Sequence, residues 1–171
     1  HDALPISSRF YGREGNDTLR IIQTEKKYIG YEVNLSKNYI KFIGGENKSN
    51  SQSFHARLFI FQEQGQIYTH KLADTMPNIT LQKQPVIAYL ESIENVVGSE
   101  IGNDIIYGDQ KNNYLNGMGG VDSLYGLAGD DTLVLREGYA QGGAGNDSYT
   151  ILRASNTDNN VKQLETIIDE E

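Results

Sequence analysis

Apolar and polar positions follow two different rhythms along the chain. Over residues 21–97, short segments rich in β-branched and aromatic residues alternate with turn signals, which predicts β-strands. The expected strands cover residues 28–35, 38–43, 57–61, 66–70 and 86–90. From residue 98 onward, single apolar residues recur about every nine positions instead. This regular spacing indicates a repeat rather than a conventional globular core.

Aligning the second region on its apolar positions reveals a nine-residue unit that begins with glycine and carries aspartate or asparagine at its sixth position. Regular copies begin at Gly108, Gly117, Gly126 and Gly142, and the copy that begins at Gly98 contains one extra residue. A further copy, residues 12–20, stands alone near the start of the sequence. Residues 135–141 interrupt the series, because they are two residues short and contain no aspartate.

The end of each unit predicts a three-residue strand whose central apolar side chain points inward, because strand side chains alternate between faces. The other six residues turn the chain, and glycine is favoured where φ is positive or where carbonyls crowd together. Such turns gather backbone carbonyls and a carboxylate, the hard oxygen ligands that Ca²⁺ takes six to eight at a time. Zinc prefers nitrogen or sulfur, and magnesium demands a tighter octahedron. The expected inward residues are Ile106, Leu115, Leu124, Leu133, Ala140 and Tyr149.

Charge and glycine are concentrated in the repeat region. Residues 98–150 hold 12 of the 18 glycines and a net charge of −6, out of −8 for the whole chain. This acidic balance suits a cation-binding protein and argues against nucleic acid as a partner. The chain has no cysteine, which excludes disulfides and thiolate metal sites. With only 37% apolar residues, the fold needs a source of stability other than a large apolar core.

The nonapeptide, G-G-x-G-x-D-x-U-x with U a large apolar residue, resembles the hemolysin-type calcium-binding repeat of the RTX (repeats-in-toxin) family. The resemblance covers residues 98–150 and 12–20, and residues 93–99 resemble the lead-in that commonly precedes such repeats. It implies an all-β fold, a calcium-loaded right-handed parallel β-roll with a β-rich flanking or capping segment. The expected domains are a flank at 1–97, the roll at 98–150 and a C-terminal cap or flank at 151–171.

The resemblance also implies how the turns stack. Two repeats make one coil of a β-roll, so the Gly98 turn is expected to stack with the Gly117 turn, and the Gly108, Gly126 and Gly142 turns to line the other edge. Each calcium ion then lies between two stacked turns, which pairs Asp104 with Asp122, Asn113 with Asp131, and Asp131 with Asp147. The irregular residues 135–141 place a calcium ion above Asp122 in doubt.

The isolated copy at residues 12–20 is expected to dock its turn beneath the Gly98 turn, with Asp17 as an extra ligand. The candidate calcium ligands that the resemblance implies, through side chains or backbone carbonyls, are Asp17, Asp104, Gly108, Gln110, Asn113, Gly117, Gly119, Gly120, Asp122, Gly126, Ala128, Gly129, Asp131, Gly142, Gly143, Gly145 and Asp147. The other carboxylates of the region, Asp109, Asp130 and Glu137, are interpreted as surface charge. Its tyrosines are interpreted as strand residues that pack on the roll rather than as a sugar-stacking platform.

The implied function is that of a calcium-binding module from a large secreted bacterial protein, such as an RTX toxin, adhesin or exoenzyme. Such a module stays unfolded in the low-calcium cytosol, leaves by type I secretion and folds on calcium in the extracellular space. Two alternatives remain open. In the first, residues 21–97 are a recognition module for a host-cell receptor or glycan, and the roll is its scaffold. In the second, the chain is an accessory domain of an exported enzyme.

Catalysis and membrane insertion are not expected of this chain. It contains no phosphate-binding glycine motif, and its histidines, His1, His55 and His70, form no H-E-x-x-H zinc motif. We therefore expect no catalytic residue and no enzyme activity. No apolar run approaches the roughly 18 residues that a membrane-spanning helix requires, so no transmembrane segment is expected.

Overall fold

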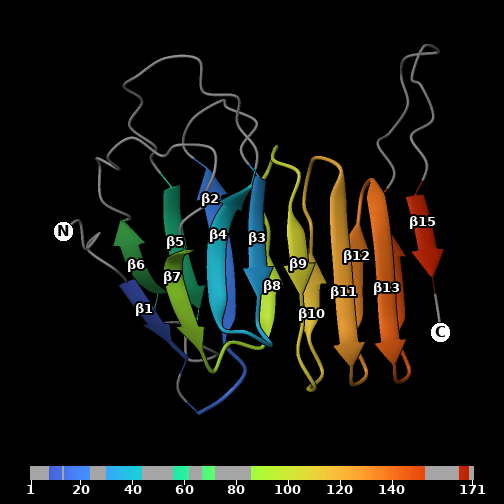
Figure 1. Cartoon of the computed structure of the whole chain (residues 1–171), viewed down its shortest axis with the longest axis horizontal. Helices are drawn as coiled ribbons and strands as arrows, with labels where there is room; N and C mark the ends of the chain where they lie inside the picture. The colour runs from blue at the N-terminus through green and yellow to red at the C-terminus, as the bar shows by residue number, and fades with distance from the viewer. Residues whose placement is uncertain are drawn as a thin grey trace.

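The computed structural model describes residues 8–12, 14–23, 30–43, 56–61, 67–71, 86–152 and 166–169. Within these ranges the chain forms strands and no helix, and none of the described residues builds a helix fit to cross a membrane. The strands make two sheets that lie one behind the other in Figure 1. The expected all-β class is confirmed.

One sheet has eight strands. In spatial order they are β1 (Ser8–Tyr11), β7 (Val86–Glu91), β4 (Tyr39–Ile43), β3 (Gly30–Asn34), β9 (Ile105–Tyr107), β11 (Asp122–Ala128), β13 (Gly138–Ala144) and β15 (Thr166–Asp169). The other sheet has seven: β14 (Ser148–Ile151), β12 (Thr132–Leu135), β10 (Tyr114–Asn116), β8 (Asn95–Val97), β2 (Thr18–Gln23), β5 (Ala56–Phe61) and β6 (Ile67–Lys71).

The repeats alternate between the two sheets, so that the chain coils. Strands β8, β10, β12 and β14 are parallel neighbours in one sheet, and β9, β11 and β13 are parallel neighbours in the other. The result is a parallel β-solenoid of about three turns, as an RTX β-roll requires. This arrangement confirms the prediction that two repeats form one coil.

A narrow core runs along the axis of the solenoid. The registers align Val96, Leu115 and Leu133 in one sheet and Ile106, Leu124 and Ala140 in the other. All six are buried with no exposed surface, because each occupies an inward-pointing position of its strand. Tyr149, expected inside, is only partly buried and packs against the end of this core. The last described coil is therefore less enclosed than the others.

The flank extends both sheets. Strands β2 and β3 pair in parallel with β8 and β9, and beyond them β4, β5 and β6 pair in an antiparallel manner. The strands expected at 28–35, 38–43, 57–61, 66–70 and 86–90 are all present as β3 to β7. Leu19 and Val33 continue the buried ladder into the flank. The roll and its flank therefore share two continuous sheets, with β15 at the opposite end (Figure 1).

Tyrosines also line up across neighbouring strands of the eight-stranded sheet. The rings of Tyr107 and Tyr125 stack with centroids 4.8 Å apart and an interplanar angle of 10°. Tyr139 follows Tyr125 at 5.5 Å, tilted by 45°. These rings contact each other along the sheet, which supports their interpretation as packing residues of the roll.

Candidate calcium sites

The turns of the roll stack in two rows, one at each edge of the sheets. We call one row the Asp122 edge, which comprises residues 98–104, 117–122 and the short link 136–137. The other is the Asp131 edge, which comprises residues 108–113, 126–131 and 142–147. Backbone hydrogen bonds join the stacked turns, from Gly98 N–H to Asn116 O at 2.8 Å and from Gly129 N–H to Ala144 O at 2.9 Å. The predicted stacking is therefore confirmed.

The sixth position of each repeat is connected to the same position of the next coil. The backbone N–H of Asp104 donates to Oδ1 of Asp122 at 2.8 Å. On the other edge Asn113 donates to Oδ1 of Asp131 at 2.7 Å, and Asp131 donates to Oδ1 of Asp147 at 2.9 Å. The three pairs expected from the repeats are thus brought together. Each link uses only one of the two carboxylate oxygens.

The second carboxylate oxygen turns back into its own turn, against the first glycine of the repeat. A Cβ atom added to Gly126 would overlap Oδ2 of Asp131, and it would meet the carbonyl oxygen of Gly142 in the next coil at 2.5 Å. A Cβ added to Gly117 would overlap Oδ2 of Asp122. Glycine is required here because carboxylate and carbonyl oxygens occupy the space that any side chain would fill.

Two of these oxygens have no hydrogen-bond partner. Oδ2 of Asp122 and Oδ2 of Asp131 are buried and accept nothing, although each residue is only 1% exposed. A buried carboxylate oxygen without a donor or a cation is strongly unfavourable. Crowded oxygen atoms around such a carboxylate fit a hard divalent cation. The residues present therefore fit calcium at these two positions.

The electrostatics of the carboxylates also favour a cation at these two positions. Burial raises the pKa of Asp122 to about 8, and the negative charges of Asp104 and Glu137 add to the effect, while the hydrogen bond from Asp104 N–H opposes it. Burial likewise raises the pKa of Asp131 to about 6, with contributions from the charges of Asp147, Asp109 and Asp130. Without a cation, the ionised form of both groups is disfavoured.

Asp104 differs from these two, because protein donors satisfy it. Its Oδ2 accepts from the backbone N–H of Ser99 at 2.6 Å and from the Ser99 hydroxyl at 2.9 Å. Its Oδ1 accepts from the backbone N–H of Tyr31 at 2.7 Å. Burial still raises its pKa to about 6, opposed by these hydrogen bonds. Asp104 therefore has the weaker need for a cation.

Asn113 is also satisfied within the protein. Its Oδ1 accepts from Asp109 N–H at 2.8 Å, and its Nδ2 donates to Glu94 O at 2.9 Å. In addition, Lys111 forms a 2.9 Å ion pair with Glu94. An amide thus occupies the position where the next coil has the unpartnered carboxylate oxygen of Asp131.

All the other candidate ligands lie on one of the two edges. On the Asp131 edge are Gly108, Gln110, Asn113, Gly126, Ala128, Gly129, Asp131, Gly142, Gly143, Gly145 and Asp147. On the Asp122 edge are Asp104, Gly117, Gly119, Gly120 and Asp122. Gly120 has a φ of 111°, and a Cβ there would overlap Gly102 O of the neighbouring turn. The turns are therefore packed as closely as the glycine pattern predicts.

The isolated copy docks differently from the expectation. The repeat pattern places its turn beneath the Gly98 turn, but Gly12 N–H donates to Glu91 O at 2.7 Å and Asn95 N–H donates to Asp17 O at 3.0 Å. Its strand β2 pairs with β8, which places Asp17 in line with the Asp131 edge. The prediction is wrong because residues 12–20 stack on residues 91–95 rather than on the Gly98 turn. Stacked repeats must place their turns on the same edge of the roll.

Sequence reasoning missed several residues that complete these edges. Ser99 is fully buried and satisfies Asp104, and Glu94 accepts from Asp17 N–H at 3.0 Å. A signal for Glu94 was available, since it stands four residues before Gly98 just as Asp104 stands four before Gly108. Ser99 carries no comparable signal. Among the described residues, no three histidine or acidic side chains gather into a metal site, so a cation must also use backbone carbonyls.

Comparison with known proteins gives one match. Residues 100–133 fit the family model of the RTX calcium-binding nonapeptide repeat, in four copies. These residues include the Gly108, Gly117 and Gly126 turns together with Asp122 and Asp131. No curated protein and no solved structure matches the chain significantly.

Proposed function

The chain carries RTX calcium-binding nonapeptide repeats, and we propose that they make it a folding module that becomes ordered when calcium binds. The observation that carries the proposal is the pair of buried, unpartnered oxygens, Oδ2 of Asp122 and Oδ2 of Asp131. They occupy the same position of two different repeats, one on each edge of the roll. Asp131 and Asp147, with the Gly142 carbonyl, would hold one ion there, and calcium would supply the positive charge between them.

Energetics favour the coupling of calcium binding to folding. Residues 98–150 carry six net negative charges, and ordering a chain costs on the order of 1–2 kcal/mol per residue. Most strands of the roll bury a single apolar side chain, although β12 buries Leu133, Val134 and Leu135. This narrow core offsets only part of that cost. Each ion that binds the folded state alone adds about 1.4 kcal/mol at roughly tenfold excess over its Kd. Several sites together supply a large share of an ordinary folding free energy.

The same coupling suits a protein that must cross a membrane unfolded. We propose that the chain belongs to a large secreted bacterial protein, such as a toxin, adhesin or exoenzyme, and works in the extracellular space. Low calcium in the cytosol would keep the roll unfolded for type I secretion, and millimolar calcium outside would fold it. Extracellular calcium modules bind with Kd values of roughly 10⁻⁴–10⁻³ M, which matches that switch.

Circular dichroism of the whole chain tests the folding proposal. In chelator the β-signal of the roll should be weak, and millimolar calcium should raise it in a single cooperative step, with magnesium a poor substitute. Hydrogen exchange then assigns the change to residues 98–150. Equal protection of these amides with chelator and with calcium would refute the proposal.

We further propose that the chain itself performs no catalysis. The carboxylates whose pKa values are raised, Asp104, Asp122 and Asp131, face oxygen-rich turns, which suits cation binding rather than proton transfer. Assays on protein, lipid and glycoside substrates should therefore show no turnover. Reproducible turnover that a single substitution in the chain abolishes would contradict this.

A further inference from the structure

The link between β12 and β13 is a shortened turn of the Asp122 edge. It consists of Arg136 and Glu137 alone, whereas the preceding turn spans residues 117–121. Gly138, with a φ of 122°, brings the chain directly against Asp122, because a Cβ there would overlap the Asp122 backbone. The backbone N–H of Asp122 donates to Glu137 O at 2.9 Å. Asp122 and Glu137 therefore lie next to each other on adjacent coils.

Both neighbours present a buried oxygen without a partner. Oδ2 of Asp122 and Oε1 of Glu137 accept no hydrogen bond, and Asp122 is only 1% exposed. Glu137 is half-buried rather than exposed, so the interpretation of it as mere surface charge is incomplete. Each of the two buried oxygens needs a donor or a cation.

The place of Glu137 follows from what this coil lacks. In the Gly98 and Gly126 turns, the carboxylate oxygen shares its space with the carbonyl of the next coil's first glycine, Gly117 or Gly142. Beside Gly117, the three nearest atoms all belong to Asp122. Residues 135–141 contain neither the first glycine nor the aspartate of the repeat, and Glu137 is the carboxylate that this link contributes instead.

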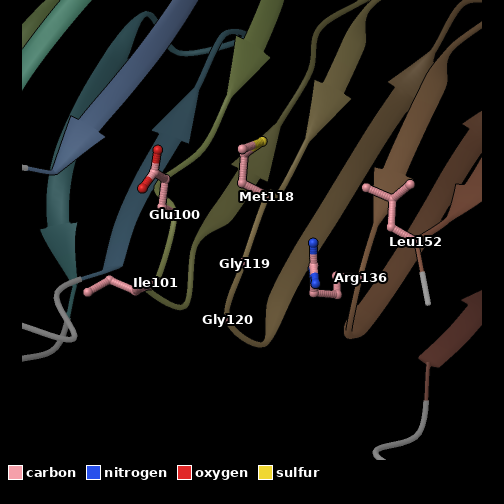
Figure 2. A pocket seen from close by; sticks show the side chains of 7 residues that line it. All are labelled: Glu100, Ile101, Met118, Gly119, Gly120, Arg136 and Leu152. Atoms are coloured by element: carbon pink, nitrogen blue, oxygen red, sulfur yellow. The ribbon is translucent and has the colours of Figure 1, made fainter. Parts of the chain in front are cut away.

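Arg136 does not neutralise this pair. It lines a surface hollow of about 490 Å³, together with Glu100, Met118 and Leu152. Figure 2 shows its side chain directed into that hollow, between Met118 and Leu152. The guanidinium makes no hydrogen bond to either unpartnered oxygen. The positive charge of the link thus lies in the surface hollow, and the two buried oxygens are left without a positive partner from the protein.

We infer that Glu137 is a side-chain ligand of the calcium site proposed at Asp122, a ligand that the nonapeptide motif does not encode. Backbone carbonyls and water complete the oxygen shell of that site. The inference rests on the proposed calcium binding for the identity of the ion, but its ligand set is specific to this chain. Two carboxylates and hard oxygen ligands favour calcium over zinc.

Calorimetric titration of the full chain with calcium chloride, combined with native mass spectrometry, tests the site. Glu137→Gln should lose one bound ion or weaken one site at least about tenfold, because it removes one of two charged ligands. Glu100→Gln is the matched control, since Glu100 is exposed and lies across the hollow from Arg136 (Figure 2). The control should bind like the wild type.

Further variants separate the possible results. Asp131→Asn should remove a different ion, so that the double variant with Glu137→Gln loses both. If Glu137→Gln fails to fold, Glu137→Lys places an ammonium beside Asp122 and should fold while binding one ion fewer. Wild-type ion count and affinity in Glu137→Gln, with calcium bound by the wild type, would overturn this inference alone. Absence of calcium binding by the wild type would overturn the proposed function as well.

Discussion

The backbone N–H of Asn113 donates a hydrogen bond of 2.7 Å to Oδ1 of Asp131, which lies 18 residues later and one coil further along. The backbone N–H of Asp131 in turn donates a hydrogen bond of 2.9 Å to Oδ1 of Asp147. Asp131 therefore connects three successive turns of its edge and still holds an unpartnered Oδ2. No other residue among those described combines these two properties on the Asp131 edge.

We expect Asp131→Ala to raise the calcium concentration at the folding midpoint more than Asp104→Ala or Asp147→Ala. The substitution removes the ligand oxygen and the acceptor of Asn113 together, whereas Asp104 is satisfied by Ser99 and Tyr31. A shift of roughly tenfold corresponds to about 1.4 kcal/mol. Calcium titrations followed by circular dichroism provide the ranking.

The neighbouring Asp130→Ala serves as the control for this comparison, because it removes the same charge from an exposed side chain of the same turn. Its hydrogen bond from Asn146 N–H is at the surface, so only a small shift is expected. The assigned register would be wrong if Asp131→Ala were the mildest of the three ligand variants.

Gly126→Ala should damage the Asp131 site by displacing the carboxylate. The added methyl group would overlap Oδ2 of Asp131 and meet Gly142 O at 2.5 Å, and overpacking of this kind costs about 1–3 kcal/mol. Both stability and calcium affinity should fall. Gly15→Ala is the control, because Gly15 has a φ of 136° but nothing within 4 Å of its Cβ position. It should cost stability through backbone strain and leave calcium affinity unchanged.

Leu124→Ala should destabilise the calcium-loaded roll by about 2–5 kcal/mol, the usual range for a large-to-small substitution in a packed core. Leu124 has no exposed surface and lies between Ile106 and Ala140 in the buried ladder. Leu127→Ala, three residues later, is the matched control because Leu127 is 43% exposed. Urea unfolding in saturating calcium measures both. Equal losses in the two variants would contradict the inward assignment.

Acid should partly replace calcium. Burial raises the pKa of Asp122 to about 8 and that of Asp131 to about 6, above the value of about 3.9 in an unfolded chain. A raised carboxylate pKa stabilises the folded state below the unfolded pKa, and this stability is lost as the pH rises through the folded pKa. In calcium-free buffer, the β-signal should therefore increase as the pH falls from about 8 towards 4.

The same protons compete with calcium, so the calcium midpoint should rise as the pH is lowered through that window. Circular dichroism at fixed calcium concentrations, repeated from pH 5 to pH 8, measures both effects. Asp122→Asn should flatten the upper part of the profile and Asp131→Asn the lower part. A calcium midpoint independent of pH would show that these carboxylates do not bind the ion.

Much of the solenoid could be predicted from local pattern. The nine-residue phase identified Leu115, Leu124 and Leu133 as inward residues, and each is fully buried. The resemblance to the RTX family implied that alternate turns lie on opposite edges, as the stacking of Asn113 with Asp131 confirms. The inward positions follow from sequence because strand side chains alternate and glycine permits the tight turns, both of which are properties of a few consecutive residues.

The hydrogen-bond partners of each carboxylate were decided by tertiary structure alone. Asp104 and Asp122 occupy the same position of their repeats, yet Asp104 is satisfied by Tyr31, 73 residues away, while Oδ2 of Asp122 has no partner. Glu137 is half-buried, with its backbone carbonyl bound to Asp122 N–H across a shortened link, and the copy at residues 12–20 joined the edge opposite to the one expected. The physical reason is that hydrogen-bond partners come from strands distant in sequence, and sheet register between such strands is set by packing rather than by any local repeat.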